Sequence, residues 1–333
     1  MKNARKALEK HRDYLMSLEN VVGVGVGYKM VRGKETKEPA MVVFVSKKLP
    51  QAYLRGETLV PKKLDKMATD VIEVGEIKMY GRTDRMRPAQ PGMSIGHYNI
   101  TAGTFGAVVK DAKSGELLIL SNCHVLANAT NGKDGKAQPG DPIYQPGAYD
   151  GGTDNDIIAH LDRFIPIHRA FEEIDCPVAL AAAAVGDRMV KLVRRNYRLR
   201  MEKNYGITNK VDCAVARPTS ADMVNEDIYE LGRVTGTTIA EPGLTVQKSG
   251  RTSGVTAGKV NAVDVTLRVA LGSNDFAIFT DQVISDILSR PGDSGSLILD
   301  EQMQAVGLLF AGSDQVTVFN RQENVAEALE IKF

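Results

Sequence analysis

The chain has 333 residues, of which 43% are hydrophobic and 25% charged, and this balance predicts a folded globular protein rather than a disordered chain. Its 42 Lys and Arg residues are nearly cancelled by 41 Asp and Glu residues, and it contains no Trp. A broad basic field is absent and base-stacking aromatic side chains are poorly supplied, so we expect no nucleic-acid partner.

Cysteine usage and hydropathy indicate where such a protein would work. Cys123, Cys176 and Cys213 lack the spacing of a disulfide framework or a zinc site, so we expect a reducing compartment, no metal and no other cofactor. The first 20 residues are highly charged, and no segment has the length and apolarity of a signal peptide or a membrane span. The sequence predicts a soluble, cytoplasmic protein and leaves homo-oligomerisation open.

The N-terminal segment, residues 1–81, mixes helical and strand patterns. Apolar residues at near-helical spacing predict an amphipathic helix over residues 2–18, and apolar runs predict strands at 21–28, 40–45 and 70–74. The glycines of the first run do not form a dinucleotide fingerprint, because a strand rather than a helix follows them. We expect a small α+β domain with a regulatory or assembly role, followed by a linker over residues 82–91.

Short apolar runs alternate with turns rich in Gly, Asn and Asp from residue 101 onward, a pattern typical of sandwiches and barrels. An Ala-rich and then basic segment, residues 177–203, interrupts the pattern and predicts a helical insertion within about residues 170–205. Its basic residues are compatible with a membrane surface or a polyanion, but a solvated helix face explains them more simply. The predicted second domain spans residues 92–333.

A glycine-rich turn near the C-terminus has the pattern of a catalytic serine. It reads Gly292-Asp293-Ser294-Gly295-Ser296 and precedes an apolar run. Glycines on both sides permit a tight turn that exposes the Ser294 hydroxyl, and the amides of Gly292 and Ser294 are candidate oxyanion donors. Acyl transfer by serine also needs an imidazole that takes the proton and a carboxylate that orients the imidazole.

Candidates for both groups lie upstream. His124 ends an apolar run and is the preferred base, with His97 as its only serious rival. Asp212 begins an apolar run, where a partly buried charge needs a partner, while Asp156 has a similar setting and stays an alternative. The order His124, Asp212, Ser294 matches the chymotrypsin class and differs from the order in subtilisins and α/β-hydrolases.

With these residues in this order, the sequence resembles trypsin/chymotrypsin-like serine peptidases, and in particular a bacterial group related to the plant narrow-leaf proteases. The resemblance is carried by residues 91–97, 101–106, 120–128 and 145–152 and extends to the C-terminus. It implies a mostly β, chymotrypsin-like double β-barrel with the triad in the cleft between the barrels. The helical insertion and the small N-terminal α+β domain are additions to that minimal enzyme.

The resemblance also implies substrate contacts. One strand resembles the strand that pairs with substrate backbone and lines the specificity pocket; its residues are Phe310, Ala311 and Gly312. The position that sets pocket charge in trypsin-like enzymes falls near Leu288 and Ser289, where no acidic residue stands. A preference for Lys or Arg is therefore not expected.

We expect a serine endopeptidase that hydrolyses protein or peptide substrates through an acyl-enzyme, with His124, Asp212 and Ser294 as its triad. Two alternatives stay open. One is a catalytically silent binding or scaffold protein on the same fold. The other is a latent protease that is restrained by its N-terminal domain.

Overall fold

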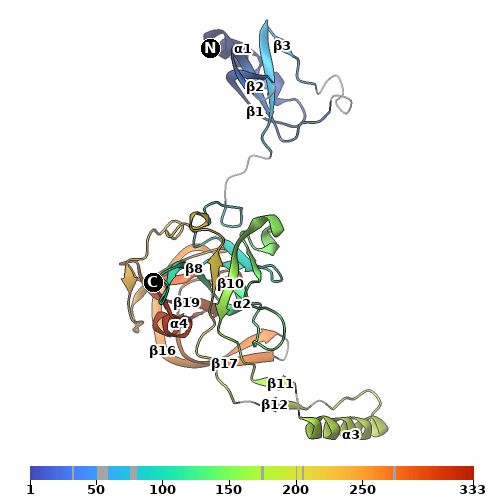
Figure 1. The fold of residues 1–333 in the computed structure, drawn as a ribbon, viewed down its shortest axis with the longest axis vertical. Helices are drawn as coiled ribbons and strands as arrows, with labels where there is room; N and C mark the ends of the chain where they lie inside the picture. Colours follow the sequence, from blue (N-terminus) through green and yellow to red (C-terminus); the bar gives the residue numbers. More distant parts are fainter. Residues whose placement is uncertain are drawn as a thin grey trace. The chain divides into compact units, whose positions relative to one another are not determined.

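The computed structural model describes residues 1–31, 34–50, 59–75, 81–173, 176–199, 201–204, 206–272 and 275–333. It divides the chain into two compact units, Met1–Tyr80 and Gly81–Phe333 (Figure 1). Each unit has its own hydrophobic core.

The first unit is a small sheet covered by one helix. Its elements are α1 (Lys2–Met16), β1 (Val21–Val31), β2 (Lys34–Val45), β3 (Lys63–Leu64) and β4 (Met67–Glu73), with the strand order β1-β2-β4-β3. The apolar stripe of α1 places Leu8 and Leu15 against Met41 and Val43 of β2, all of them buried. The helical spacing of apolar residues seen in the sequence thus places them on the face of α1 that packs on the sheet.

The first barrel of the second unit closes through one bent strand. Its strands are β5 (Ser94–His97), β6 (Gly103–Thr104), β7 (Ala107–Asp111), β8 (Leu117–Ser121), β9 (Pro142–Tyr144), β10 (Ile157–Phe164) and β13 (Ala214–Pro218). The order is β7-β8-β13-β10-β9-β5-β6, with β21 (Ile331–Lys332) added beside β7. Between β6 and β7, Phe105 N donates to Met93 O and Gly106 N to Leu120 O, both at 2.9 Å. The continuous segment from β6 to β7 therefore bends and forms hydrogen bonds to strands at both ends of the sheet, which closes the sheet into a barrel.

The second barrel is built from a later, continuous stretch of chain. Its strands are β15 (Thr245–Gly250), β16 (Gly254–Gly272), β17 (Asp275–Ser285), β18 (Leu297–Leu299), β19 (Gln304–Gly312) and β20 (Thr317–Arg321). They follow the order β19-β18-β15-β16-β17-β20, and an additional β19–β20 pairing closes the ring. β14 (Gly236–Thr237) lies parallel to β19, and α4 (Gln322–Leu329) follows β20.

A shared apolar layer joins the two barrels. Leu118 and Leu120 of β8 pack in one buried cluster with Leu297 of β18 and Leu308 of β19. The mostly β, double-barrel fold predicted from the sequence is confirmed by this strand order and packing.

The insertion is a helix carried on a two-stranded ribbon. α3 (Pro177–Val193) lies between β11 (Phe171–Glu173) and β12 (Glu202–Asn204), which pair antiparallel. The sequence predicted the helix but not the ribbon. No residue of α3 is buried, and even Val178 and Leu192 are largely exposed. In the described part of the chain, no helix has both the length and the apolarity needed to cross a membrane.

Residues 82–91, predicted as a linker, belong to the second unit and pack against the rest of it. Arg82 O accepts from Ser94 N at 2.7 Å, and the Arg82 guanidinium pairs with Glu230 at 2.8 Å. Ala89 is fully buried, and its amide donates to Met223 O at 2.7 Å.

We expect Gly295→Ala to destabilise the protein more than Gly140→Ala. Both glycines have positive φ, +94° and +97°, so both substitutions incur the left-handed backbone cost of about 1–2 kcal/mol. A Cβ on Gly295 would also overlap the Ser121 side chain and the Thr104 carbonyl, whereas Gly140 has open space. The overlap adds about 1–3 kcal/mol, measurable by denaturant unfolding. Equal losses would contradict this account.

Candidate active site

His124 lies in a single helical turn, α2 (Cys123–Leu126), directly after β8. The sequence predicted a strand end at this position. The turn is fixed by the Asn122 carbonyl, which accepts the amides of Val125 at 3.1 Å and Leu126 at 2.9 Å. The His124 side chain is 31% exposed, so its ring borders solvent while its backbone is held.

Asp212 is brought to His124 by strand pairing. Ser121 of β8 lies opposite Ala214 of β13, which places the residues just after β8 beside those just before β13. Asp212 Oδ2 lies 2.5 Å from His124 Nδ1, and Oδ1 accepts the His124 amide at 3.2 Å. The Asp212 side chain is almost completely buried, so its charge depends on these contacts.

The surroundings of His124 raise the pKa of its imidazole above the ordinary value of a histidine in water. Burial lowers the pKa of the imidazole, but the negative charge of Asp212 and its hydrogen bond raise it, and the net pKa lies above the ordinary value of 6.5. Because Nδ1 faces Asp212, the neutral ring donates its Nδ1 proton and keeps Nε2 free to accept one.

Replacing Asp212 with Asn should lower the His124 pKa, because both contributions that raise it depend on the carboxylate. The matched control is Asp156→Asn, which should leave the His124 pKa unchanged. The measurement is an NMR titration of the His124 ring in each folded variant. A His124 pKa that responds equally to both substitutions would contradict the assignment of the pair.

Asp212 is itself held by two buried asparagines. Asn122 Nδ2 donates to Asp212 O at 2.7 Å, and Asn320 Oδ1 accepts the Asp212 amide at 3.0 Å. Asn320 Nδ2 also donates to Leu308 O at 3.0 Å, which ties the Asp212 backbone to β19. Asn320 was not predicted from the sequence, because β20 (Thr317–Arg321) mixes polar and apolar residues and Asn320 does not stand out in it.

The rival candidates have other partners. His97 is fully buried on β5, and its Nε2 lies 3.1 Å from Asp141 Oδ2. Asp156 accepts from Arg85 Nε at 2.9 Å and caps its own turn through Thr153. The structure therefore pairs His124 with Asp212 and not with Asp156.

The serine turn has its carbonyls occupied and two amides available. Thr252 Oγ1 donates to Pro291 O at 2.9 Å, Thr104 Oγ1 to Gly292 O at 2.8 Å, and Thr104 N to Ser294 O at 2.7 Å. In the described part of the chain, the amides of Gly292 and Ser294 have no acceptor. They are thus available to bind a negatively charged oxygen.

The Ser294 hydroxyl is directed to β19. Ser294 Oγ lies 3.4 Å from Phe310 O, and among the described residues no hydrogen bond joins it to His124. Gly103 of β6 lies between Val125 and the serine turn. A Cβ on Gly103 would overlap the Val125 side chain and lie 3.1 Å from Ser294 O, so the serine turn packs closely against β6 next to Val125.

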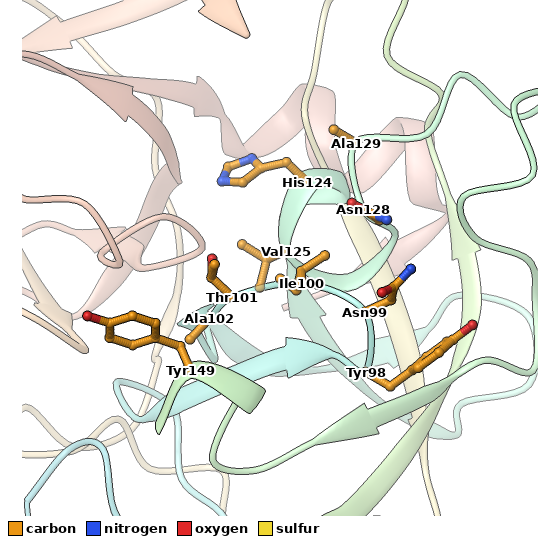
Figure 2. A pocket seen from close by; sticks show the side chains of 10 residues that line it. All are labelled: Tyr98, Asn99, Ile100, Thr101, Ala102, His124, Val125, Asn128, Ala129 and Tyr149. Carbon is orange, nitrogen blue, oxygen red and sulfur yellow. The ribbon is translucent and has the colours of Figure 1, made fainter. Parts of the chain in front are cut away.

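Two hollows adjoin the candidate residues. The larger, about 670 Å³, is lined by His124 and by residues of the β5–β6 loop, with Tyr98 and Tyr149 on its sides (Figure 2). The smaller, about 310 Å³, is lined by Ser294, Ser289, Ala311 and Gly312. The histidine and the serine therefore border different hollows.

The predicted substrate strand has an open edge. β18 pairs with β19 only as far as Leu308, and no described strand pairs with residues 310–312 on that edge. The Phe310 side chain is buried against Phe279, with ring centroids 4.7 Å apart, so only its backbone is available there.

Cys123 and Cys213 are both free and buried. Burial raises the pKa of each thiol, and the charge of Asp212 adds to this effect. Both therefore favour the unreactive thiol form over the thiolate.

Comparison with known proteins gives one family match and several similar structures. Residues 7–74 match the family model described as the NARROW LEAF 1 N-terminal domain. Curated protein sequences give no match.

The similar solved structures are serine proteases of low sequence identity. Protease A of Thermobifida fusca is 17% identical, with 73% of this chain and 96% of that chain covered and a TM-score of 0.45. Cellulomonas bogoriensis chymotrypsin and the Nocardiopsis protease are each 16% identical, with 73% of this chain and 97% of the other chain covered. Their TM-scores are 0.44 and 0.45. The match of residues 7–74 to the narrow-leaf family model confirms the narrow-leaf relation predicted from the sequence.

Proposed function

We propose that the chain is a serine endopeptidase with Ser294 as nucleophile, His124 as general base and acid, and Asp212 as the orienting carboxylate. The observation that carries this proposal is the 2.5 Å contact between His124 Nδ1 and the buried Asp212 carboxylate. It is the arrangement that leaves Nε2 as proton acceptor and stabilises the imidazolium that forms.

The reaction begins with proton transfer from Ser294. The hydroxyl rotates from the Phe310 carbonyl toward His124 Nε2, gives its proton to that nitrogen, and its oxygen attacks the substrate carbonyl carbon. The oxyanion that forms is bound by the amides of Gly292 and Ser294. His124 then gives the proton to the leaving amine, which produces the acyl-enzyme. In the second half of the reaction, water gives a proton to His124 and attacks the ester, and His124 returns that proton to Ser294 Oγ as the acid product leaves.

The two hollows receive the two halves of the substrate. The leaving amine takes its proton from His124, so the C-terminal half lies in the 670 Å³ hollow that His124 lines. The acyl half stays on Ser294, so its side chain enters the 310 Å³ hollow while its backbone pairs with the open edge at Ala311 and Gly312.

The pocket next to Ser294 favours an uncharged side chain. Its Ser289 hydroxyl is bonded to Thr317 Oγ1 at 2.6 Å, and the exposed Arg290 and Asp314 supply opposite charges. Leu288, at the position expected to set pocket charge, carries no charge and is 51% exposed.

For the N-terminal unit we propose a regulatory or assembly role, as expected from the sequence, and for the whole protein a cytoplasmic location with protein or peptide substrates. The free Cys123, Cys176 and Cys213 support a reducing compartment.

Ser294→Ala should abolish labelling by a fluorophosphonate probe and lower peptide hydrolysis by about 10⁴-fold or more, because the attacking oxygen is removed. Ser114→Ala, in an exposed turn, is the control and should label as the wild type does. Circular dichroism should show both variants folded. Labelling that persists in Ser294→Ala would contradict the assignment of Ser294 as nucleophile. A folded wild type that neither labels nor cleaves a diverse peptide library would favour a silent binding protein.

Gly312→Val should narrow the pocket, since a Cβ on Gly312 would lie 2.9 Å from Ser289 Oγ. We expect kcat/KM to fall by about 10-fold or more for substrates with a large acyl-side residue and to change little for Ala. Gly272→Val is the control, because a Cβ there meets nothing within 4 Å. Equal losses for large and small residues would contradict the pocket assignment.

A further inference from the structure

Helix α3 of the insertion has an apolar face that nothing in the described part of the chain covers. Val178, Val185, Met189 and Leu192 recur at intervals of seven, four and three residues, which places them on one side of the helix, and Val193 follows Met189 by four. Their exposed fractions are 77%, 57%, 64% and 86%, and that of Val193 is 82%. A solvated polar face, favoured from the sequence, does not account for five large apolar side chains exposed together.

Another side of α3 is occupied by the chain itself. Leu199 lies so close to Gly186 that a Cβ on the glycine would be 2.5 Å from Leu199 Cδ2. The Leu199 amide donates to Asp187 Oδ1 at 3.1 Å, and Lys191 Nζ lies 2.5 Å from Asp187 Oδ2. The segment after the helix therefore engages the single acidic residue of α3 and leaves the apolar face open.

The insertion is held at both ends by the second barrel. Before it, the Ala170 amide donates to Phe276 O at 2.9 Å, and after it, the Asn209 amide donates to Ile278 O at 2.8 Å. Both acceptors belong to β17. A partner that binds α3 is therefore tied to the double-barrel unit.

Basic side chains flank the apolar face. Residues 176–199 carry five cations and one carboxylate, although the whole protein has a net charge of only +1. Arg188 lies four residues before Leu192, at the border of the apolar face, and Arg194 and Arg195 follow the helix. Among the described residues, none of these three arginines forms an ion pair with a carboxylate, so they are available to an anionic partner.

We propose that α3 binds the surface of an anionic lipid bilayer, with its apolar face among the upper acyl chains and its arginines on the lipid phosphates. A helix of 17 residues is about 25 Å long, shorter than a hydrocarbon core of about 30 Å, so it lies in the interface and does not cross. A second copy of the chain would bring like charges into the same contact, which opposes pairing. Aliphatic side chains without aromatic anchors also suit a fluid acyl layer better than a shaped protein groove.

The first test is flotation of the full-length protein with vesicles of phosphatidylcholine alone or of equal parts phosphatidylcholine and phosphatidylglycerol. Wild type should float with the anionic vesicles only, and added salt should weaken the binding. Met189→Gln/Leu192→Gln should weaken it about 10-fold or more, because two apolar side chains no longer leave water. Arg194→Gln/Arg195→Gln should weaken it about 10-fold or more, because two contacts with lipid phosphates are lost.

Matched controls test whether the apolar face and its arginines are responsible. Ala184→Gln introduces the same side chain at an exposed position four residues before Arg188, away from the apolar face. Arg5→Gln/Lys6→Gln removes two neighbouring exposed cations from α1. Both should bind vesicles as wild type does, and so should Ser294→Ala, because the proposed binding does not use the proposed nucleophile. No residue of α3 is buried, so the α3 variants should fold.

The absence of Trp from the sequence allows the contact to be observed directly. Leu192→Trp places a single fluorescent ring on the apolar face, and its emission should shift to the blue when anionic vesicles are added, because the ring leaves water. Ala184→Trp should show no such shift.

Each other outcome overturns the proposal. These outcomes are a folded wild type that does not bind anionic vesicles, and equal binding by wild type and both α3 double variants. A dimer that Met189→Gln/Leu192→Gln dissociates, with Leu192→Trp emission already blue-shifted without vesicles, would assign the face to a second copy. Binding to heparin but to neither vesicle would assign the arginines to a soluble polyanion. Fluorophosphonate labelling of Ser294 reports separately on the protease function.

Discussion

The hydrogen bond from the Thr104 amide to the Ser294 carbonyl, 2.7 Å long, is the point on which the arrangement of the site depends. Thr104 belongs to β6 of the first barrel, and Ser294 lies in the loop before β18 of the second. The two barrels supply different residues of the proposed triad, His124 and Asp212 from one and Ser294 from the other. Their relative position therefore decides whether the three groups act together. Gly295, which packs against Ser121 and Thr104 without room for a side chain, makes this approach close.

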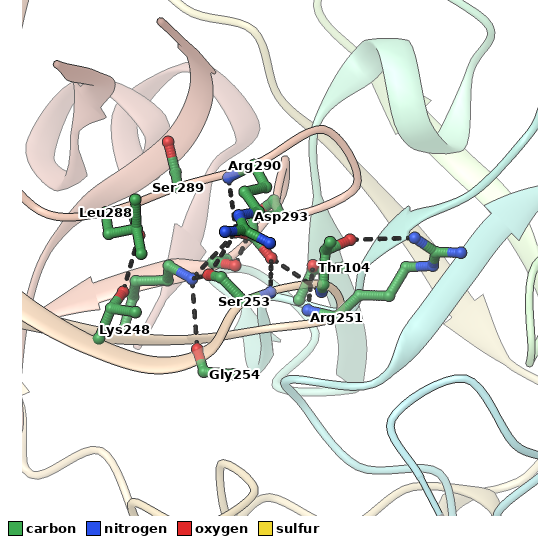
Figure 3. A network of polar contacts seen from close by, with 12 residues as sticks. Thr104, Lys248, Arg251, Ser253, Gly254, Leu288, Ser289, Arg290 and Asp293 are labelled. Carbon is green, nitrogen blue, oxygen red and sulfur yellow. Dashed lines mark hydrogen bonds and ion pairs between the residues drawn. The ribbon is translucent and has the colours of Figure 1, made fainter. Parts of the chain in front are cut away.

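Two buried carboxylates do different work on either side of that contact. Asp212 faces an imidazole whose ring borders solvent, and its charge and hydrogen bond raise the pKa of that imidazole. Asp293 faces Lys248, a lysine that is as buried as itself, and four further donors from the chain surround it (Figure 3). A pair of this kind is costly to bury and costly to break, and it fixes backbone geometry in preference to exchanging protons.

Sequence reasoning predicted the mostly β fold because strand and turn signals are local, and signals of the same local kind mark the candidate site residues. Strand and turn patterns predict a barrel, and the Gly-Asp-Ser-Gly turn and the order of His124, Asp212 and Ser294 indicate the class. The contacts that support these residues are not local. Asn320, Lys248 and Thr104 look ordinary in the sequence, and their roles come from strand register and from barrel closure. The same limit applies to α2, where one helical turn interrupts an apolar run, and to the ribbon that carries α3.

Two sets of contacts hold the serine turn, and they differ in sequence separation. This difference affects the order in which they form during folding. Thr104 Oγ1 bonds Gly292 O across 188 positions, while Lys248 and the turn of residues 251–253 lie about 40 positions from Asp293. Contacts of long sequence separation form late, because loop closure must be completed before they contribute stability. Contacts within the second barrel can therefore form around the serine loop before Thr104 reaches it, and the loop approaches His124 only when both barrels are folded. A partly folded chain thus carries Ser294, the proposed nucleophile, apart from His124, the base proposed to activate it.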